Sequence, residues 1–290
     1  MILKSKAQER IAILGGEGFV GTHLREAAEE DDTMVTVFDA SVSRESPDRI
    51  RLDVRDLTPD HLAGCSRVFH LAGLLGTAET FDNVEEAIRT NILGTLAVLN
   101  AAKARSIPVT YVTLGNRWLN PYTITKNAAA DFCLMFREAY GLSVQVVVTY
   151  NLYGPHQKVQ PVRKIVPSFL TRLIAGQPVE INGDGEQVVD MVYARDFARE
   201  ILRERASGVV HVGTGVPLTV NRVARLCADA LGVGDYQVAH LAGRRGEPSR
   251  SVSLSPNGYR HITATPIEQG LAVTARWYRE HAGGAVPGRS

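Results

Sequence analysis

The sequence predicts an α/β protein with a doubly wound parallel sheet and a smaller carboxyl-terminal region. Short β-rich runs alternate with helical patterns through the first half of the chain, as in folds that place helices on both faces of a parallel sheet. A glycine-rich turn, Gly15-Gly-Glu-Gly18-Phe-Val-Gly21, connects the first strand to the first helix. The alternation ends at Gly154-Pro155, where a region with a different rhythm begins.

The elements of the first half follow in a regular order. β-branched and aromatic residues are concentrated in short runs, which predict strands at residues 11–14, 34–38, 49–52, 67–71, 109–113 and 144–149. Apolar residues recur at helical spacing, which predicts helices at residues 20–30, 83–105 and 121–140. Strand, turn, helix and strand at the start form the opening βαβ unit of a parallel sheet.

The second region is expected to lie over the carboxyl edge of the sheet. Its pattern predicts helices at 166–175, 220–231 and 266–280, and strands at 178–182, 187–193 and 209–212. A tight turn is expected at 183–185. Gly283-Gly284 would cap the closing helix, and residues 283–290 are expected to be frayed.

Composition favours a soluble protein that acts on small molecules. Lys plus Arg number 32 and Asp plus Glu number 31, and neither charge occurs in blocks, which disfavours nucleic acid and acidic membranes as partners. Three cysteines without a C-x-x-C pair and eight scattered histidines predict reduced thiols, a cytoplasmic location and no metal site. No apolar stretch is long enough to span a membrane, and the first ten residues lack the apolar core of a signal peptide.

The glycine loop and two acidic residues indicate a dinucleotide site. Glycines at 15, 18 and 21 allow backbone N–H groups and a helix amino terminus to approach a pyrophosphate, although such turns also occur for purely structural reasons. Asp39 ends the second strand, where a carboxylate can accept hydrogen bonds from an adenosine ribose and would repel a 2′-phosphate, which favours NAD over NADP. Asp53, before Val54, either meets the adenine amino group or caps a turn.

Tyr122 and Lys126 lie four residues apart and therefore share one face of the helix expected at 121–140. A free tyrosine has a pKa of about 10, so a base at neutral pH needs a nearby positive charge to stabilise its phenolate. Lys126 can supply that charge. The alternative is an exposed helix that carries an incidental tyrosine and lysine.

Further motifs follow the glycine loop in order: His70-Leu-Ala-Gly73, Asn91-Ile-Leu-Gly-Thr95, Tyr122-x-x-x-Lys126, Asn151-Leu-Tyr-Gly-Pro155, Gly183-Asp-Gly-Glu-Gln187, His211-Val-Gly-Thr-Gly215 and Arg244-Arg-Gly-Glu247. With them, the chain resembles the extended short-chain dehydrogenase/reductase family, specifically its nucleotide-sugar epimerases and dehydratases. The resemblance covers essentially the whole chain.

The resemblance implies a domain organisation and an assembly. Residues 1–155 would form an NAD-binding Rossmann domain, and residues 156–265 would mostly form a nucleotide-sugar-binding region. Segments 187–206 and 266–281 would return to the Rossmann part, so that the two are interleaved. The helices expected at 83–105 and 122–140 would pair with their copies in a homodimer, with apolar residues that equally suit internal packing: Ile92, Leu96, Leu99, Phe132, Leu134 and Phe136.

The resemblance also implies site residues. Tyr122 would take a proton from a sugar hydroxyl, and Lys126 would also hold the nicotinamide ribose. NAD would be bound by Gly15, Gly18, Phe19, Val20, Gly21, Asp39, Asp53, Val54, Leu71, Ala72, Gly73, Asn91, Tyr122 and Lys126. A nucleotide sugar, a UDP- or dTDP-hexose by the breadth of the family, would be bound by Asn151, Lys164, Val166, Glu180, Asn182, Arg244 and Glu247.

Two departures from the family pattern affect these expectations. Thr113 is the candidate for a third catalytic hydroxyl, but if Leu114 occupies that position the role is lost or falls to Thr123 or Thr125. In the late strand Val189 replaces an arginine that would contact the diphosphate, a contact that the nearby basic residues could replace: Arg163, Lys164 or Arg245.

The segment at 114–121 bears on the reaction. It is shorter than in relatives and lacks the acid pair by which dehydratases of the family protonate a leaving hydroxyl. The sequence therefore favours an NAD-dependent 4-epimerase that acts through a 4-keto sugar. A 4-ketoreductase or an atypical dehydratase is the alternative within enzymes, and a non-catalytic NAD-binding regulatory or scaffold protein is the alternative from another class.

Overall fold

A central sheet of eight parallel strands organises the computed structural model, which describes residues 9–247, 252–253, 260–261 and 265–281. The strand order is β15-β11-β6-β5-β4-β1-β2-β3. From that edge the strands are β15 (Arg260–His261), β11 (Gly208–Gly213), β6 (Val144–Thr149), β5 (Val109–Leu114), β4 (Arg67–His70), β1 (Arg10–Leu14), β2 (Met34–Asp39) and β3 (Arg49–Arg51). The order reverses between β1 and β4, so a crevice for a ligand is expected at the carboxyl ends of these two strands.

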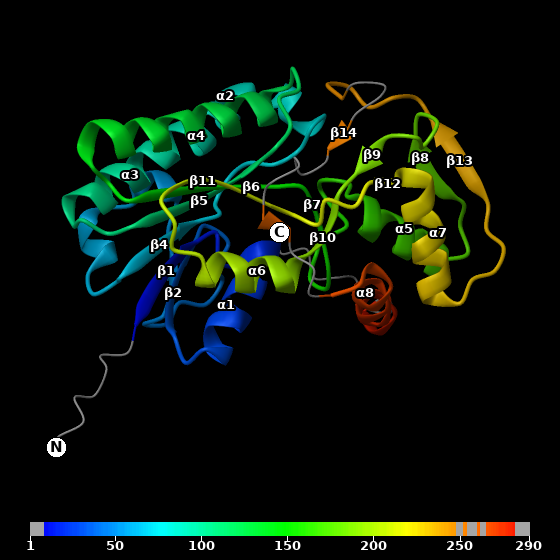
Figure 1. The fold of residues 1–290 in the computed structure, drawn as a ribbon, viewed down its shortest axis with the longest axis horizontal. Coiled ribbons are helices and arrows are strands. Elements are labelled where there is room, and N and C mark those ends of the chain that lie inside the picture. The colour runs from blue at the N-terminus through cyan, green and yellow to red at the C-terminus, as the bar shows by residue number, and fades with distance from the viewer. Residues whose placement is uncertain (1–8, 248–251, 254–259, 262–264, 282–290) are drawn as a thin grey trace.

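Helices cover both faces of this sheet, as the sequence predicts (Figure 1). One face carries α1 (Phe19–Glu30) and α6 (Ala194–Arg203), whose apolar residues pack against Ile11, Ile13 and Phe69 of the sheet. The other carries α2 (Val84–Ile88), α3 (Gly94–Ala104) and α4 (Pro121–Tyr140) over a second apolar core. Short 3₁₀ turns lie at η1 (Val54–Asp56), η2 (Pro59–Leu62) and η3 (Glu79–Asp82). The Rossmann-type fold class is thus confirmed.

The second region has a core of its own at the carboxyl edge of the sheet (Figure 1). Its helices are α5 (Ile165–Ile174), α7 (Val220–Leu231) and α8 (Ile267–His281). Small sheets pair β7 (Asn151–Tyr153) with β10 (Met191–Tyr193), β8 (Val179–Asn182) with β13 (Val238–Leu241), and β9 (Val188–Val189) with β12 (Leu218–Thr219) and β14 (Val252–Ser253). Thr219 caps α7 by accepting a hydrogen bond from the Arg222 N–H, and Gly232 ends the helix with φ +67°.

Several elements differ from expectation. The helix expected at 83–105 is interrupted by a π-helical turn, η4 (Arg89–Leu93), and the strand expected at 187–193 divides into β9 and β10. Helix α8, which we expected to return to the Rossmann part, instead packs against α7 and α5 and places Leu271, Ala275 and Tyr278 in the second core. The expected cap at Gly283-Gly284 and the frayed tail lie outside the described residues.

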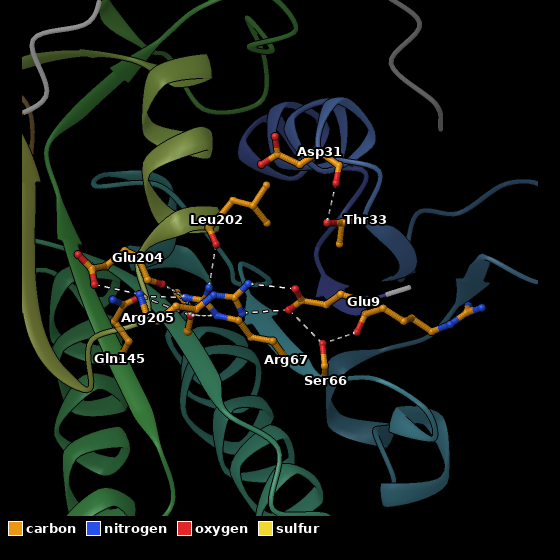
Figure 2. Close-up of polar contacts among 11 residues, drawn as sticks. Glu9, Asp31, Thr33, Ser66, Arg67, Gln145, Leu202, Glu204 and Arg205 are labelled. Carbon is orange, nitrogen blue, oxygen red and sulfur yellow. Dashed lines mark hydrogen bonds and ion pairs between the residues drawn. The ribbon is translucent and has the colours of Figure 1, made fainter. Parts of the chain in front are cut away.

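A buried arginine anchors the end of α6 to the amino edge of the sheet. The Arg67 side chain on β4 is 3% exposed and donates hydrogen bonds to Thr110 Oγ1, Gln145 Oε1 and the Leu202 and Glu204 carbonyls. Figure 2 shows Arg67 among Gln145, Leu202 and Glu204, beside the ion pair of Arg205 with Glu9. Burial lowers the pKa of Arg67 to about 10, and the group remains charged at neutral pH.

We expect Arg67→Met to lower the free energy of unfolding by about 3 kcal/mol, because it leaves several buried acceptors without a donor. Arg205→Met is the matched control. It removes an exposed ion pair with Glu9 and should cost less than about 1 kcal/mol. Urea unfolding at pH 7 measures both, and equal losses for the two variants would contradict the anchoring role of Arg67.

Candidate active site

One cavity of about 660 Å³ runs along the carboxyl ends of the sheet strands and into the second region. All but one of the residues assigned to cofactor, catalysis or substrate by sequence line this cavity; the exception is Asn91. The glycine loop and Asp39 lie at one end, Tyr122 and Lys126 contribute to the wall, and β8 and loop 244–247 contribute from the second region. The arrangement can therefore hold an extended dinucleotide and a second ligand side by side.

The glycine loop forms a close-packed cradle at the start of α1. Gly15 has φ +84°, and a Cβ atom there would lie 2.7 Å from the backbone nitrogen of Ala72. A Cβ atom at Gly21 would lie 2.5 Å from the Gly15 carbonyl oxygen. No side chain can therefore replace hydrogen at these two positions without moving the backbone. The loop leaves the amino end of α1 open toward the cavity, as pyrophosphate binding requires.

Two carboxylates lie beyond the glycine loop. Asp39 Oδ2 accepts the Glu17 N–H at 3.0 Å, and Asp39 Oδ1 accepts the N–H and hydroxyl of Ser41, so the carboxylate is fixed at the end of β2. Asp53 caps the turn η1 by accepting the Arg55 N–H, pairs with the Arg55 guanidinium at 2.6 Å and also lines the cavity. Capping, one of the two roles considered for Asp53, is present. Contact with adenine stays a prediction.

Tyr122 and Lys126 enter the cavity from the first turns of α4. Asn120 caps this helix and Pro121 begins it, which fixes the start of the helix one residue before Tyr122. Burial raises the pKa of Tyr122 to about 12 and lowers the pKa of Lys126 to about 8. The Lys126 ammonium lies 4.3 Å from the centre of the Tyr111 ring, a cation–π contact that offsets part of its desolvation.

Asn91 supports the cavity from behind. Its Oδ1 accepts the Leu74 N–H at 2.7 Å, and its Nδ2 donates to the Leu74 carbonyl and to Thr125 Oγ1. The side chain, 1% exposed, thus ties the loop after β4 to α4. It lies in the π-helical turn η4 and holds the wall near Gly73, where a Cβ atom would meet the Asn91 oxygen at 2.9 Å.

The candidates for a third catalytic hydroxyl all have partners on the main chain. Thr113 is 4% exposed, lines the cavity and donates to the Lys126 carbonyl at 3.4 Å. Thr123 donates to the Trp118 carbonyl, and Thr125 donates to the Pro121 carbonyl at 2.7 Å. Of these three, Thr113 and Thr123 line the cavity. Because two hydroxyls remain available, the assignment of Thr113 stays a proposal.

The substrate end of the cavity contains an unpaired amide and several charged groups. Asn151 Nδ2 is buried without a hydrogen-bond partner in the described structure, which leaves a donor for a ligand. Burial and the neighbouring Arg244 lower the pKa of Lys164 to about 8. Glu180 on β8 pairs with Arg163 at 2.9 Å and with Arg172 at 3.0 Å. Val189, in place of the family's arginine, is buried in the cavity wall.

Comparison with known proteins agrees with this geometry. A family model described as "NAD dependent epimerase/dehydratase family" matches residues 11–209. The chain belongs to this family.

A dTDP-glucose 4,6-dehydratase of Streptomyces antibioticus is 29% identical over 315 residues, which cover 93% of this chain and 92% of the relative. Two solved structures are also similar. The UDP-glucose 4-epimerase of Thermotoga maritima, with UDP-glucose, has a TM-score of 0.83 and 25% identity, covering 93% of this chain and 99% of that one. DesIV, a dTDP-glucose 4,6-dehydratase of Streptomyces venezuelae with NAD bound, has a TM-score of 0.82 and 27% identity. The match covers 96% of this chain and 99% of that one.

Membership of the NAD dependent epimerase/dehydratase family makes the chain an NAD-dependent enzyme of the nucleotide-sugar epimerase/dehydratase type. The glycine cradle and the fixed Asp39 carboxylate fit NAD. None of the helices in the described residues is both long and apolar enough to cross a bilayer.

Several residues that line the cavity were not predicted from the sequence. Trp118 and Asn116 come from the shortened segment after β5, and Tyr150 follows β6 with its hydroxyl 2.9 Å from His211 Nδ1. A Cβ atom at Gly115 would meet the Tyr150 ring at 2.8 Å. In the sequence, only the position of Tyr150 next to the Asn151 motif could have indicated that it lines the cavity. Its contact with Gly115 leaves no local signal, because the two residues follow different strands.

Proposed function

We propose that the chain is an NAD-dependent nucleotide-sugar 4-epimerase, with Tyr122 as its base. The absence of any carboxylate between Thr113 and Tyr122 is the observation that carries this choice. A 4,6-dehydration must expel a hydroxyl from C6, and an acid near that group lowers the cost. Gly115 and Asn116 occupy the positions that follow the strand, and neither can donate an acidic proton. An inversion at C4 needs no such acid.

Tyr122 and Lys126 have different roles in the proposed reaction. Tyr122 accepts the proton of the C4 hydroxyl while the C4–H bond breaks, and it returns the proton when the ketone is reduced from its other face. When bound, NAD⁺ would supply the acceptor for the C4 hydride and the donor that returns it. We propose that the positive charge of Lys126, which lies against the Tyr111 ring, favours the Tyr122 phenolate and so opposes the effect of burial.

Substrate anchoring is assigned to the far end of the cavity. We propose that Asn151 Nδ2, Lys164 and Arg244 bind the diphosphate, because an unpaired amide and two cations favour an anion there. Glu180, Asn182, Val166 and Glu247 would surround the nucleoside. The relatives named above act on dTDP- and UDP-glucose, which supports a dTDP- or UDP-hexose.

A dehydratase is the second candidate, because the dTDP-glucose 4,6-dehydratase of Streptomyces antibioticus is 29% identical over nearly the whole chain. One experiment separates the two. The protein is incubated with UDP- and dTDP-hexoses without added cofactor, and NMR follows the sugar ring. Inversion at C4 is the expected result. A stable 4-keto-6-deoxy product would replace the epimerase by the dehydratase, and an unchanged panel would remove both.

We also propose a homodimer formed through α2–α4. Leu99 and Phe136, two of the apolar residues first considered, are buried within the subunit. The same helices expose Ile88, Leu93, Ile124 and Met135 by 39–53%, which leaves an apolar face for a second copy. Light scattering after size exclusion should give twice the 31.6 kDa mass of one chain.

A further inference from the structure

A single amide joins the amino end of the catalytic helix to the second region. Asn120 is 1% exposed, and its Oδ1 accepts the Thr123 N–H at 2.9 Å as the cap of α4. Its Nδ2 donates to the Gly246 carbonyl at 2.9 Å. The two bonds use opposite ends of the amide, so one side chain both caps the helix and holds the loop.

Close packing supports this hydrogen bond. Gly246 has φ +77°, and a Cβ atom there would lie 2.8 Å from Asn120 Cβ and 2.8 Å from the Phe81 ring. The Arg245 guanidinium lies 4.0 Å from the centre of the Phe81 ring, which adds a cation–π contact. Loop 244–247 is therefore fixed against both η3 and α4.

This loop contributes two residues to the cavity. Arg244 and Glu247 line it, and the Glu247 N–H donates to the Arg244 carbonyl at 3.1 Å. Their side chains are 3.8 Å apart. Tyr122, two residues after Asn120, lines the same cavity. The Asn120 contact thus lies between the proposed base and the proposed nucleotide anchor.

We propose that Asn120 is a positioning residue for the substrate, whose amide holds loop 244–247 over the cavity with Arg244 and Glu247 already placed. This inference rests on the proposed function and deepens it. The short segment at 114–121 allows the contact, because the chain turns directly into the helix: the Asn120 N–H donates to the Trp118 carbonyl at 3.0 Å. The loop of the second region thereby forms the roof that a longer segment would otherwise provide.

Pre-organisation of this kind acts on binding rather than on the chemical step. A free loop must be ordered when substrate enters, and that ordering reduces affinity. Loss of one neutral hydrogen bond is expected to weaken nucleotide binding about three- to tenfold. The rate of proton and hydride transfer should not change as long as α4 keeps its cap.

Two variants approach the contact from opposite sides. Asn120→Asp keeps an oxygen acceptor that caps helices well but cannot donate to the Gly246 carbonyl. Gly246→Ala leaves the cap intact and forces the loop away, because its Cβ atom would overlap Asn120 and Phe81. Asn127→Asp is the control, since the Asn127 amide donates to carbonyls of Asn116 and Thr123 rather than to the loop.

Calorimetric titration of the NAD-loaded protein with UDP and dTDP, together with kcat and KM for the accepted sugar, tests the proposal. Asn120→Asp and Gly246→Ala should each raise Kd and KM three- to tenfold while kcat and NAD content stay near wild type. The double variant should be no weaker than the weaker single variant, and the Asn127→Asp control should keep the wild-type Kd. A lowered kcat at unchanged KM in Asn120→Asp would make Asn120 a helix cap alone.

Two further outcomes would overturn the positioning role of Asn120. Wild-type Kd and KM in both variants would overturn the positioning role and leave the proposed function standing. Failure of the wild-type protein to bind either nucleotide would overturn the proposed function and this inference with it.

Discussion

Replacing Tyr122 by phenylalanine is expected to lower kcat about a thousandfold while the protein still binds NAD. General acid–base catalysis by a positioned side chain contributes roughly 10²- to 10⁴-fold, and the substitution removes the phenolic oxygen that performs it. The aromatic ring stays, so the packing at the start of α4 should be preserved. Turnover is measured by NMR of the sugar ring, and NAD content is measured after release from the denatured protein.

Tyr150→Phe is the matched control for this experiment. Tyr150 also lines the cavity with a phenol, but that phenol is hydrogen-bonded to His211 on β11. Its loss should change kcat by less than about tenfold, the equivalent of one hydrogen bond. Unchanged turnover in Tyr122→Phe would remove Tyr122 as the base. An equal collapse in both variants would assign the proton transfer to the cavity phenols jointly.

Local patterns predicted most of the Rossmann part. The glycine loop and Asp39 could be located because a strand, a turn and a helix are consecutive in the chain. The hydrophobic pattern does not reveal the interruption of the helix expected at 83–105. Asn91 at that interruption bonds to Leu74 and Thr125, and such bonds between distant segments leave no periodic signal.

The second region was harder to predict for the same reason. Strand β13 (Val238–Leu241) is largely exposed and lacks an alternating pattern, so its pairing with β8 could not be inferred. The contact of Asn120 with Gly246 joins residues 126 positions apart. Arg163 and Glu180 were both placed at the substrate end, but their ion pair appears only when α5 and β8 are packed.

The sequence places His70 at the end of a strand but does not reveal the surroundings of its buried side chain. His70 ends β4 with 1% exposure, and its Nε2 lies 2.9 Å from Thr95 Oγ1. The Thr95 hydroxyl donates its own hydrogen to the Asn91 carbonyl at 2.6 Å, so the histidine must donate from Nε2. Its Nδ1 then has no hydrogen and no partner in the described structure. Burial and the nearby Lys126 lower the pKa of His70 to about 3.

This lowered pKa predicts a loss of stability in acid. Below pH 6.5 the unfolded chain binds a proton at His70 that the folded chain rejects until about pH 3. The folded state therefore loses about 1.4 kcal/mol per pH unit as the pH falls from 6.5 toward 3, and regains this stability as the pH rises back to 6.5. His70→Gln keeps an Nε2 donor for Thr95 and does not titrate. Urea unfolding of both proteins at intervals from pH 7.5 to 4.5 measures the difference. The free energy of unfolding should fall more steeply with decreasing pH in wild type, by the slope that one bound proton contributes, because the two proteins share all other titrating groups. Parallel declines would show that His70 is protonated in the folded protein, and its Nδ1 would then need a partner that accepts a hydrogen bond.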